Sequence, residues 1–217
     1  MSLLFTARSH QRVRVPRDAA IDDLAEWSVL ADLYPTTLSV PDRCDVFKKS
    51  HPKRVGTDNG TNLLVKQNYS TGVIQYAGTF FDTANVWYCA CCTVTTARGF
   101  IYKGKFSDAL SEITYGETTA THSGGIETDV TDAAYPGDVI FGNEAGRFGS
   151  ERGYAGRIAR LRWWSAPLTL AEFRQEYHAP WAVRHANLEG DYHLGWQGRE
   201  RVIDYSGNRR HGAVVGF

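Results

Sequence analysis

The feature that most constrains the fold is a series of short strand-like segments separated by turn-forming residues. Each segment is rich in β-branched or aromatic residues, and clusters such as Thr57-Asp58-Asn59-Gly60 stand between them. The segments are RCDVFKK (43–49), NLLVKQ (62–67), GVIQYAG (72–78), NVWYCACCTV (85–94), RGFIYKG (98–104), GDVIFGN (137–143) and GRIARLRWW (156–164). Short strands at near-regular spacing predict two antiparallel sheets packed face to face.

The first 35 residues predict two more strands joined by a short helical turn. Val13 and Val15 alternate ahead of Pro16, as in a strand with one buried side. The segment WSVLADLYP (27–35) places its apolar residues on one face at period two, so we expect a half-buried strand. The helical turn is expected over DAAIDDLAEW (18–27).

Only one longer helix is well signalled, by the segment TLAEFRQEY (169–177). Thr169 and Glu172 have the spacing of a capping box, in which each side chain bonds the other residue's backbone N–H. Leu170, Phe173 and Tyr177 form an apolar stripe that stops before Pro180. The sequence therefore predicts a short helix near residues 169–178.

Charge and length restrict the classes of partner. Lys and Arg together number 24, as do Asp and Glu, so no net charge draws the chain to nucleic acid or to an anionic membrane. The start, MSLLFTARSHQRVRVP, has too short an apolar stretch for a secretion signal, and no run of 18 apolar residues occurs. We therefore expect a protein made in the cytosol without a signal peptide, with no membrane insertion, and a single domain over residues 1–217.

The cysteines do not resemble a disulfide framework, because three of the four are crowded into YCACC (88–92). On a strand, Cys89 and Cys91 would face one side and Cys92 the other, while Cys44 lies far upstream. Three of them could not converge on a tetrahedral metal without distortion. We expect buried small side chains here and no bound metal.

One long stretch, residues 137–177, resembles the closing signature of laminin-G-like, concanavalin A-type jelly rolls. Phe141-Gly142 ends a strand, Tyr154-Ala155-Gly156-Arg157-Ile158 opens the next, and Pro167-Leu168-Thr169 leads into a helix. Two other segments agree: residues 85–105 are similar to the family's Trp-led strand and the hairpin with a Tyr-x-x-Gly turn that follows it, and residues 3–37 to its entry strand, short turn and next strand. With them, the resemblance spans nearly the whole chain. It implies an all-β, two-sheet antiparallel jelly-roll sandwich with one short helix near 169–178.

The C-terminal stretch DYSGNRRHGAVVGF (204–217) resembles an Asp-x-Ser-Gly-Asn turn that many relatives carry near the N-terminus. Here the turn comes last, so the resemblance implies a permuted order in which the two chain ends meet. Residues 213–217 are then expected in the sheet system beside the N-terminal strand, where they would cover an exposed sheet edge.

The same architecture includes glycoside hydrolases. The resemblance implies that their catalytic carboxylates would lie on one strand with the pattern Glu-x-Asp-x-(x)-Glu. In ETDVTD (127–132), Glu127 and Asp129 share a strand face, but the next position on that face is Thr131. Asp132 points to the other side unless a bulge intervenes. Retaining chemistry needs two carboxyl groups roughly 5–5.5 Å apart. We therefore expect no enzyme, with inverting chemistry from other carboxylates left open.

Cofactors are expected to be absent, with calcium left open because several relatives bind it through loop oxygens. No loop has a ligand spacing comparable to an EF-hand. The oxygen donors in predicted loops are Asp58, Asn59, Asp129, Asp132 and Asn143.

Aromatic side chains are the remaining indication of a ligand, because sugar rings present apolar C–H faces that stack on Trp or Tyr. Trp163 shares a strand face with Leu161 and is expected in the core, whereas Trp164 and Trp181 are candidates for exposure. Trp164, Trp181 and Asp129 are the ligand-binding candidates. The arginines of RIARLRWW are expected to pair with acidic neighbours.

The resulting hypothesis is a non-catalytic recognition module that binds a glycan or a protein surface and is displayed on a virion. The alternative is a purely structural phage capsid decoration or appendage protein, with phage capsid proteins as partners. A glycoside hydrolase is the third, disfavoured hypothesis. Homo-oligomer formation is left open.

Overall fold

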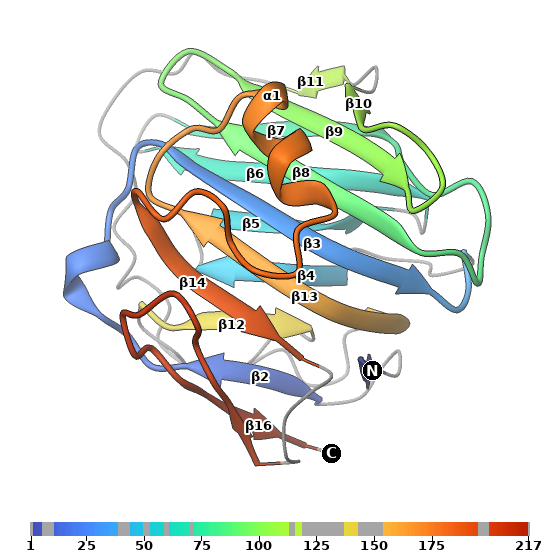
Figure 1. Cartoon of the computed structure of the whole chain (residues 1–217). Coiled ribbons are helices and arrows are strands. Elements are labelled where there is room, and N and C mark those ends of the chain that lie inside the picture. The colour runs from blue at the N-terminus through green and yellow to red at the C-terminus, as the bar shows by residue number, and fades with distance from the viewer. Residues whose placement is uncertain are drawn as a thin grey trace.

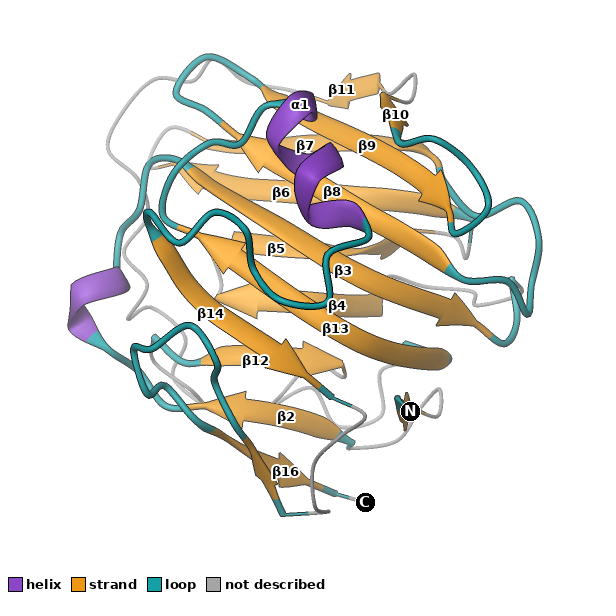
Figure 2. Cartoon of the chain, in the orientation of Figure 1, coloured by secondary structure: helices purple, strands orange, loops and turns teal. Residues whose placement is uncertain are grey.

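The computed structural model describes residues 2–5, 11–38, 44–49, 53–58, 61–69, 72–112, 116–118, 137–142, 154–194 and 200–216. Figure 1 shows two layers of strands with one helix lying on the outer side of one layer. Figure 2 shows that strands dominate the described part of the chain. The prediction of an all-β sandwich of two antiparallel sheets with one short helix is confirmed.

The first sheet has seven strands within the described residues. They are β1 (Leu3–Phe5), β3 (Trp27–Pro35), β8 (Tyr88–Val94), β9 (Gly99–Lys105), β10 (Ser111–Glu112), β13 (Gly156–Trp164) and β14 (Leu188–His193). Their order is β1-β13-β3-β8-β9-β10, and β14 also pairs with β13. We call this the outer sheet, because helix α1 (Leu170–Tyr177) lies on its outward side.

The second sheet has nine strands in the same described ranges. They are β2 (Arg12–Val15), β4 (Cys44–Lys49), β5 (Lys53–Asp58), β6 (Asn62–Tyr69), β7 (Gly72–Thr79), β11 (Gly116–Thr118), β12 (Val139–Gly142), β15 (Arg201–Val202) and β16 (Gly212–Val215). Their order is β11-β7-β6-β5-β4-β12-β2-β16-β15.

The last strand of the chain lies beside one of the first. β16 pairs antiparallel with β2, with Val214 opposite Val13. Its other side pairs with β15. The apolar C-terminal run is therefore ordered because it occupies a place in the second sheet between two partner strands.

The main core fills the space between the sheets. Phe47 on the second sheet contacts Trp27 and Trp163 on the outer sheet, with ring centroids 6.1 Å and 5.8 Å apart. Trp27 donates a hydrogen bond from Nε1 to Oε1 of Gln67 over 2.7 Å, which satisfies its only polar atom. Trp163 is buried in this cluster, as predicted.

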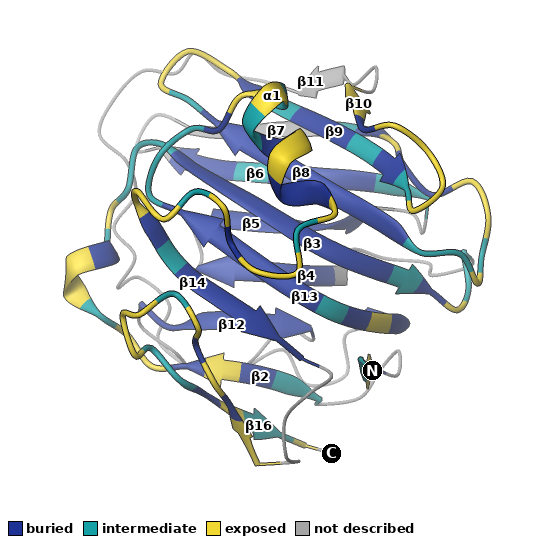
Figure 3. Ribbon diagram, in the orientation of Figure 1, coloured by how far each residue is buried: buried dark blue, intermediate teal, exposed yellow. Residues whose placement is uncertain are grey.

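A second, smaller core lies between the outer sheet and α1. Leu30, Cys89 and Cys91 point into it from β3 and β8, and Phe173 points into it from the helix. Figure 3 shows β3 and β8 buried along almost their whole length. The predicted half-buried strand at 27–35 is thus corrected, because the helix and the segment before it cover the face that the alternation assigned to solvent: Ser28 bonds Ala166 and Leu168, and Leu30 packs in the second core.

The cysteines and the helix follow the sequence predictions. Cys89 and Cys91 lie in the second core and Cys92 in the main core, and all three are free and buried. Thr169 and Glu172 form the predicted capping box. The helical turn near residue 20 is a 3-10 helix, η1 (Ala19–Ile21), capped by Asp18. No helix in the described ranges has the length and apolarity needed to cross a membrane.

Five strands were not expected from the sequence, namely β5, β10, β11, β14 and β15. β14 reads LEGDYH and contains Glu, Gly and Asp, which are poor strand formers. It forms because its whole length pairs with β13 and its acidic side chains find arginine partners.

Candidate functional site

Six large apolar side chains are exposed on the described surface, and two of them, Trp181 and Tyr205, contact each other. Exposed ones are Leu4, Phe106, Trp181, Val183, Ile203 and Tyr205. Four of the six belong to two short segments, 181–183 and 203–205. Single exposed apolar residues are common, but a contiguous group is typical of a binding surface.

Three aromatic rings from this region contact one another pairwise, and we call Trp181, His193 and Tyr205 the aromatic platform. Ring centroids are 5.6 Å apart for Trp181 and Tyr205, 4.9 Å for Trp181 and His193, and 5.4 Å for His193 and Tyr205. Trp181 is 48% exposed and Tyr205 40% exposed, whereas His193 is buried beneath them. The platform therefore presents two aromatic rings to solvent over a third that supports them.

The C-terminal turn holds Tyr205 in place. Its backbone N–H donates to the carbonyl oxygen of Asp191 over 2.8 Å, beside a bridge between Tyr192 and Asp204. The Asp204 carboxylate accepts hydrogen bonds from three backbone N–H groups, those of Asp191, Ser206 and Arg210, at 2.9–3.0 Å. This network explains the Asp-x-Ser-Gly-Asn motif, whose first residue ties the turn to β14.

Two arginines on β13 hold the segment that carries Trp181. Arg160 donates from Nη1 to the carbonyl oxygen of Ala179 over 2.6 Å. Arg162 donates from Nη2 to the carbonyl oxygen of Pro180 over 2.9 Å. The two residues that precede Trp181 are thereby fixed to the outer sheet.

Glu176, in the last turn of α1, holds the other side of the same segment. Its Oε1 accepts from the backbone N–H groups of Val183 and Arg184 at 2.9 Å and 2.6 Å. Its Oε2 accepts from Nη1 of Arg162 over 2.8 Å, and both side chains are fully buried. Trp181 therefore extends from a loop that is hydrogen-bonded on both sides to buried charged groups.

Asp191 links this network to the platform. Its Oδ1 accepts from Nε of Arg162 over 2.9 Å and lies 3.3 Å from Nε2 of His193. Burial alone would raise the pKa of Asp191, but the hydrogen bonds from His193 and Arg162 outweigh it and hold that pKa below its ordinary value. Asp191 is therefore a carboxylate at neutral pH. The expected acidic pairing is confirmed for Arg162, and for Arg160 through Asp32.

The structure places the sequence candidates differently. Trp181 is exposed in the platform, but Trp164 is 0% exposed. Its ring meets Phe173 edge to face, and its Nε1 donates to the carbonyl oxygen of Arg184. The expected exposure of Trp164 is wrong, because α1 and the following segment cover its side of β13.

The other candidates lie outside the described part of the structure. This holds for Asp129, for the catalytic candidates Glu127 and Asp132, and for the side chains of the remaining loop donors Asp58, Asn59 and Asn143. Among the residues that are described, no three His, Cys, Asp or Glu side chains are grouped as metal ligands would be.

Tyr205 and His193 were not among the sequence candidates. Their signal was weak, because Tyr205 sits inside a turn motif and His193 ends a strand that the sequence did not predict. The platform exists only where the turn, β14 and the loop after α1 meet.

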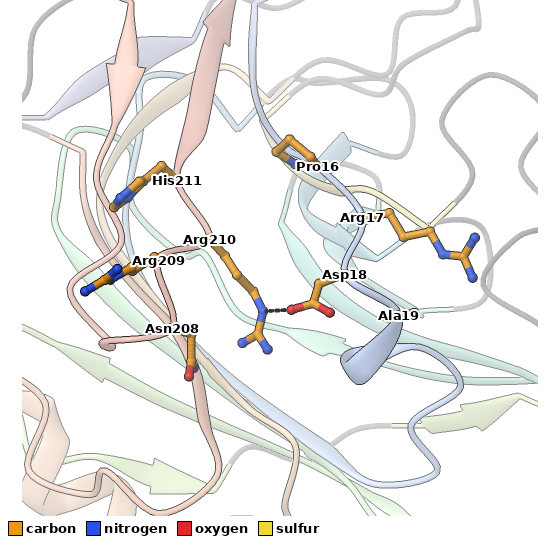
Figure 4. A pocket seen from close by; sticks show the side chains of 8 residues that line it. All are labelled: Pro16, Arg17, Asp18, Ala19, Asn208, Arg209, Arg210 and His211. Carbon is orange, nitrogen blue, oxygen red and sulfur yellow. Dashed lines mark hydrogen bonds and ion pairs between the residues drawn. The ribbon is translucent and has the colours of Figure 1, made fainter.

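A pocket of about 430 Å³ lies between residues 16–19 and the turn at 208–211, with Arg209 and His211 among its lining residues (Figure 4). Arg210 extends across it, donating from Nε to Oδ2 of Asp18 and from Nη1 to Oε2 of Glu189, each over 2.7 Å. The backbone N–H of Ala20 and the Arg210 side chain both lower the pKa of Asp18. This ion-pair group ties the C-terminal turn to the N-terminal segment.

Comparison with known proteins identifies solved structures that have the same fold. No family model matches the sequence, and a search of curated proteins gave no significant match. Solved structures match across most of the chain. One is a candidate carbohydrate-binding protein of Bacteroides ovatus ATCC 8483, with a TM-score of 0.69 and 17% identity over 100% of this chain. This chain spans only 59% of that protein's length.

Two more structures have the same fold. The binding domain of botulinum neurotoxin DC, solved in complex with SialylT, has a TM-score of 0.51 and 11% identity, covering 91% of this chain and 42% of that one. The LG1–3 region of the laminin alpha2 chain has a TM-score of 0.50 and 11% identity, covering 74% of this chain and 31% of that one. These likenesses confirm the laminin-G-like, concanavalin A-type jelly roll that the sequence motifs indicated.

Proposed function

We propose that this protein is a non-catalytic recognition module that binds a glycan on the aromatic platform of Trp181, His193 and Tyr205. The observation that carries the proposal is that two exposed aromatic rings are fixed in mutual contact over a buried charged network. The apolar C–H face of a sugar ring stacks on such a ring, and a Tyr hydroxyl beside it can exchange hydrogen bonds with sugar hydroxyls.

The rigidity of the platform supports this function. Binding is weakened by the entropy lost when flexible groups become ordered, so a surface that is already ordered binds more tightly for the same contacts. Trp181 lies between two hydrogen-bonded stretches, and the backbone of Tyr205 is bonded to β14. A ligand would find both rings already in place.

The comparisons support the proposal at the level of the fold. The Bacteroides ovatus protein is a candidate carbohydrate-binding protein, and the neurotoxin structure is that of a binding domain in complex with SialylT. Because one fold serves many functions, these likenesses add to the platform and do not replace it.

The carboxylates beside the platform do not suit hydrolysis. Glu176 and Asp191 are buried, and both are bound to Arg162. A glycosidase needs one carboxyl that gives up a proton and a second that reaches the sugar or a water molecule. Glu176 and Asp191 instead form buried ion pairs with Arg162 that stabilise the fold, which supports recognition without catalysis.

A glycan panel tests the proposal with three proteins: the wild type, Trp181→Ala, and Phe106→Ala as the control. Phe106 is 45% exposed and follows β9, and its ring contacts Trp87, Tyr177 and His178 but none of the platform rings. We expect the wild type and Phe106→Ala to bind the same glycans, and Trp181→Ala to bind them at least about tenfold more weakly through loss of a buried ring face. If the wild type binds no glycan, a structural role such as capsid decoration is favoured. If Trp181→Ala binds like the wild type, the platform is not the site.

A further inference from the structure

The strand that leads into the platform alternates between exposed and buried residues. Arg201, Ile203 and Tyr205 are exposed, whereas Val202 and Asp204 between them are buried. Side chains two residues apart on an extended chain point to the same side. Arg201 therefore lies on the surface that carries Tyr205, with Ile203 between them.

The returning strand adds to this surface. Ala213 lies directly opposite Arg201, and cross-strand neighbours share a face. His211, two residues before Ala213, accepts a hydrogen bond at Nδ1 from the backbone N–H of Asp204 over 3.0 Å. Figure 4 shows Arg209 and His211 on the same side of the turn, away from Arg210. Arg209 and His211 thus border the same surface as Arg201.

Arg201 and Arg209 differ from the other arginines of this region. Arg210 is neutralised by Asp18 and Glu189, and Arg162 by Glu176 and Asp191. Neither Arg201 nor Arg209 has a hydrogen bond or ion pair from its side chain to any described residue. These two exposed arginines are thus positive charges that no described acidic side chain pairs with, although the exposed Glu200 precedes Arg201 in the chain.

We propose that the glycan bound on the platform is acidic, and that Arg201 and Arg209, with His211, bind its carboxylate or sulfate group. The inference rests on the proposed function. A guanidinium matches the two oxygens of such a group with paired hydrogen bonds. Arg201 and Tyr205 are four residues apart, about 13 Å on an extended chain. The anionic group therefore belongs to a sugar unit next to the one that stacks, so the ligand is an oligosaccharide.

Matched pairs of polysaccharides test this inference. One pair is polygalacturonate and its fully methyl-esterified form, which differ in carboxylate charge; the other is dextran sulfate and dextran, which differ in sulfate. The proteins are the wild type, Trp181→Ala, the double variant Arg201→Gln/Arg209→Gln, and Arg98→Gln as the control, and polyglutamate serves as a competitor without sugar. Arg98 lies in the turn between β8 and β9, where its exposed ion pair with Glu112 contributes little.

We expect the wild type and Arg98→Gln to bind the anionic member of at least one pair about tenfold or more tightly than its neutral counterpart. The double variant should bind both members of that pair equally. The pair that shows the preference identifies carboxylate or sulfate as the group. The variant should keep the wild-type melting temperature, since both arginines are exposed and unpaired among the described residues.

Three outcomes overturn the inference, and they are distinguishable. If neutral and anionic members bind equally and the double variant is unaffected, the acidic-glycan inference fails while the proposed function stands. If no member binds, the acidic-glycan inference fails, and the glycan panel decides the proposed function separately. If polyglutamate competes as well as the acidic glycans and Trp181→Ala makes no difference, binding is unspecific charge attraction and the subsite is rejected.

Discussion

Arg162 donates a hydrogen bond to the carbonyl oxygen of Pro180, the residue immediately before the exposed Trp181, over 2.9 Å. The same guanidinium binds Glu176 and Asp191. One fully buried side chain on β13 thus joins the last turn of α1, strand β14 and the platform loop. The central claim, that two aromatic rings are held ready for a ligand, depends on this connection.

Arg162→Met should lower the free energy of unfolding by about 3–5 kcal/mol, because it leaves two buried carboxylates without their cation. Arg201→Met, at an exposed arginine without a described partner, should change it by less than about 0.5 kcal/mol. Urea denaturation of both variants measures the difference. Equal effects would show that the buried network does not hold this part of the structure.

Thr169→Ala should destabilise the protein by about 1 kcal/mol, because it removes the side chain that accepts from the backbone N–H of Glu172. The same denaturation assay measures this loss. Ser107→Ala, on an exposed turn, is the control and should have little effect. No loss in Thr169→Ala would mean that the cap is unimportant for α1.

Lowering the pH should destabilise the protein, partly because Asp82 becomes protonated. Burial would raise the pKa of Asp82, but hydrogen bonds from Lys103, Lys105 and Tyr88 hold it well below the ordinary value. A carboxyl whose pKa is lower in the folded state contributes stability above its unfolded pKa of about 3.9, and that contribution is lost as the pH falls.

Asp82→Asn removes this titration. Its stability should therefore fall less steeply than that of the wild type as the pH drops below about 4. Denaturation midpoints measured across the acidic range test the difference. Parallel curves for the two proteins would contradict the role assigned to Asp82.

The thiols of Cys89, Cys91 and Cys92 should be unreactive in the folded protein. Burial raises the pKa of all three, which suppresses the reactive thiolate, and it also blocks access. A thiol reagent should modify these residues only after denaturant is added, as peptide mapping can show. Modification of any of them in the native protein would contradict their placement in the two cores.

The sequence predicted those helices and strands that depend on residues close to one another along the chain. The capping box and apolar stripe of α1 are local signals, and the helix begins where they indicated. Most strands are also local patterns of alternating or β-branched residues. β14 escaped prediction because Glu189 and Asp191 are stabilised there by Arg210 and Arg162, which are distant in the sequence.

The two neighbouring tryptophans of β13 show more clearly which features could not be predicted from the sequence. Adjacent strand residues face opposite sides, so an exposed Trp164 beside a buried Trp163 was a reasonable expectation. The tertiary structure covers both sides, and both rings are buried. Trp181 was identified by residue type alone. Its partners Tyr205 and His193 could not be identified from the sequence, because they come from separate segments that meet only in the folded structure.

The most direct test of the platform is an NMR titration of nitrogen-15-labelled protein with a glycan that it binds. The indole N–H signal of Trp181, assigned by its absence in Trp181→Ala, should shift with the added glycan. The buried indoles of Trp27 and Trp163 should shift little. Binding that leaves the Trp181 signal unchanged and moves resonances elsewhere would contradict the claim that the glycan stacks on the platform.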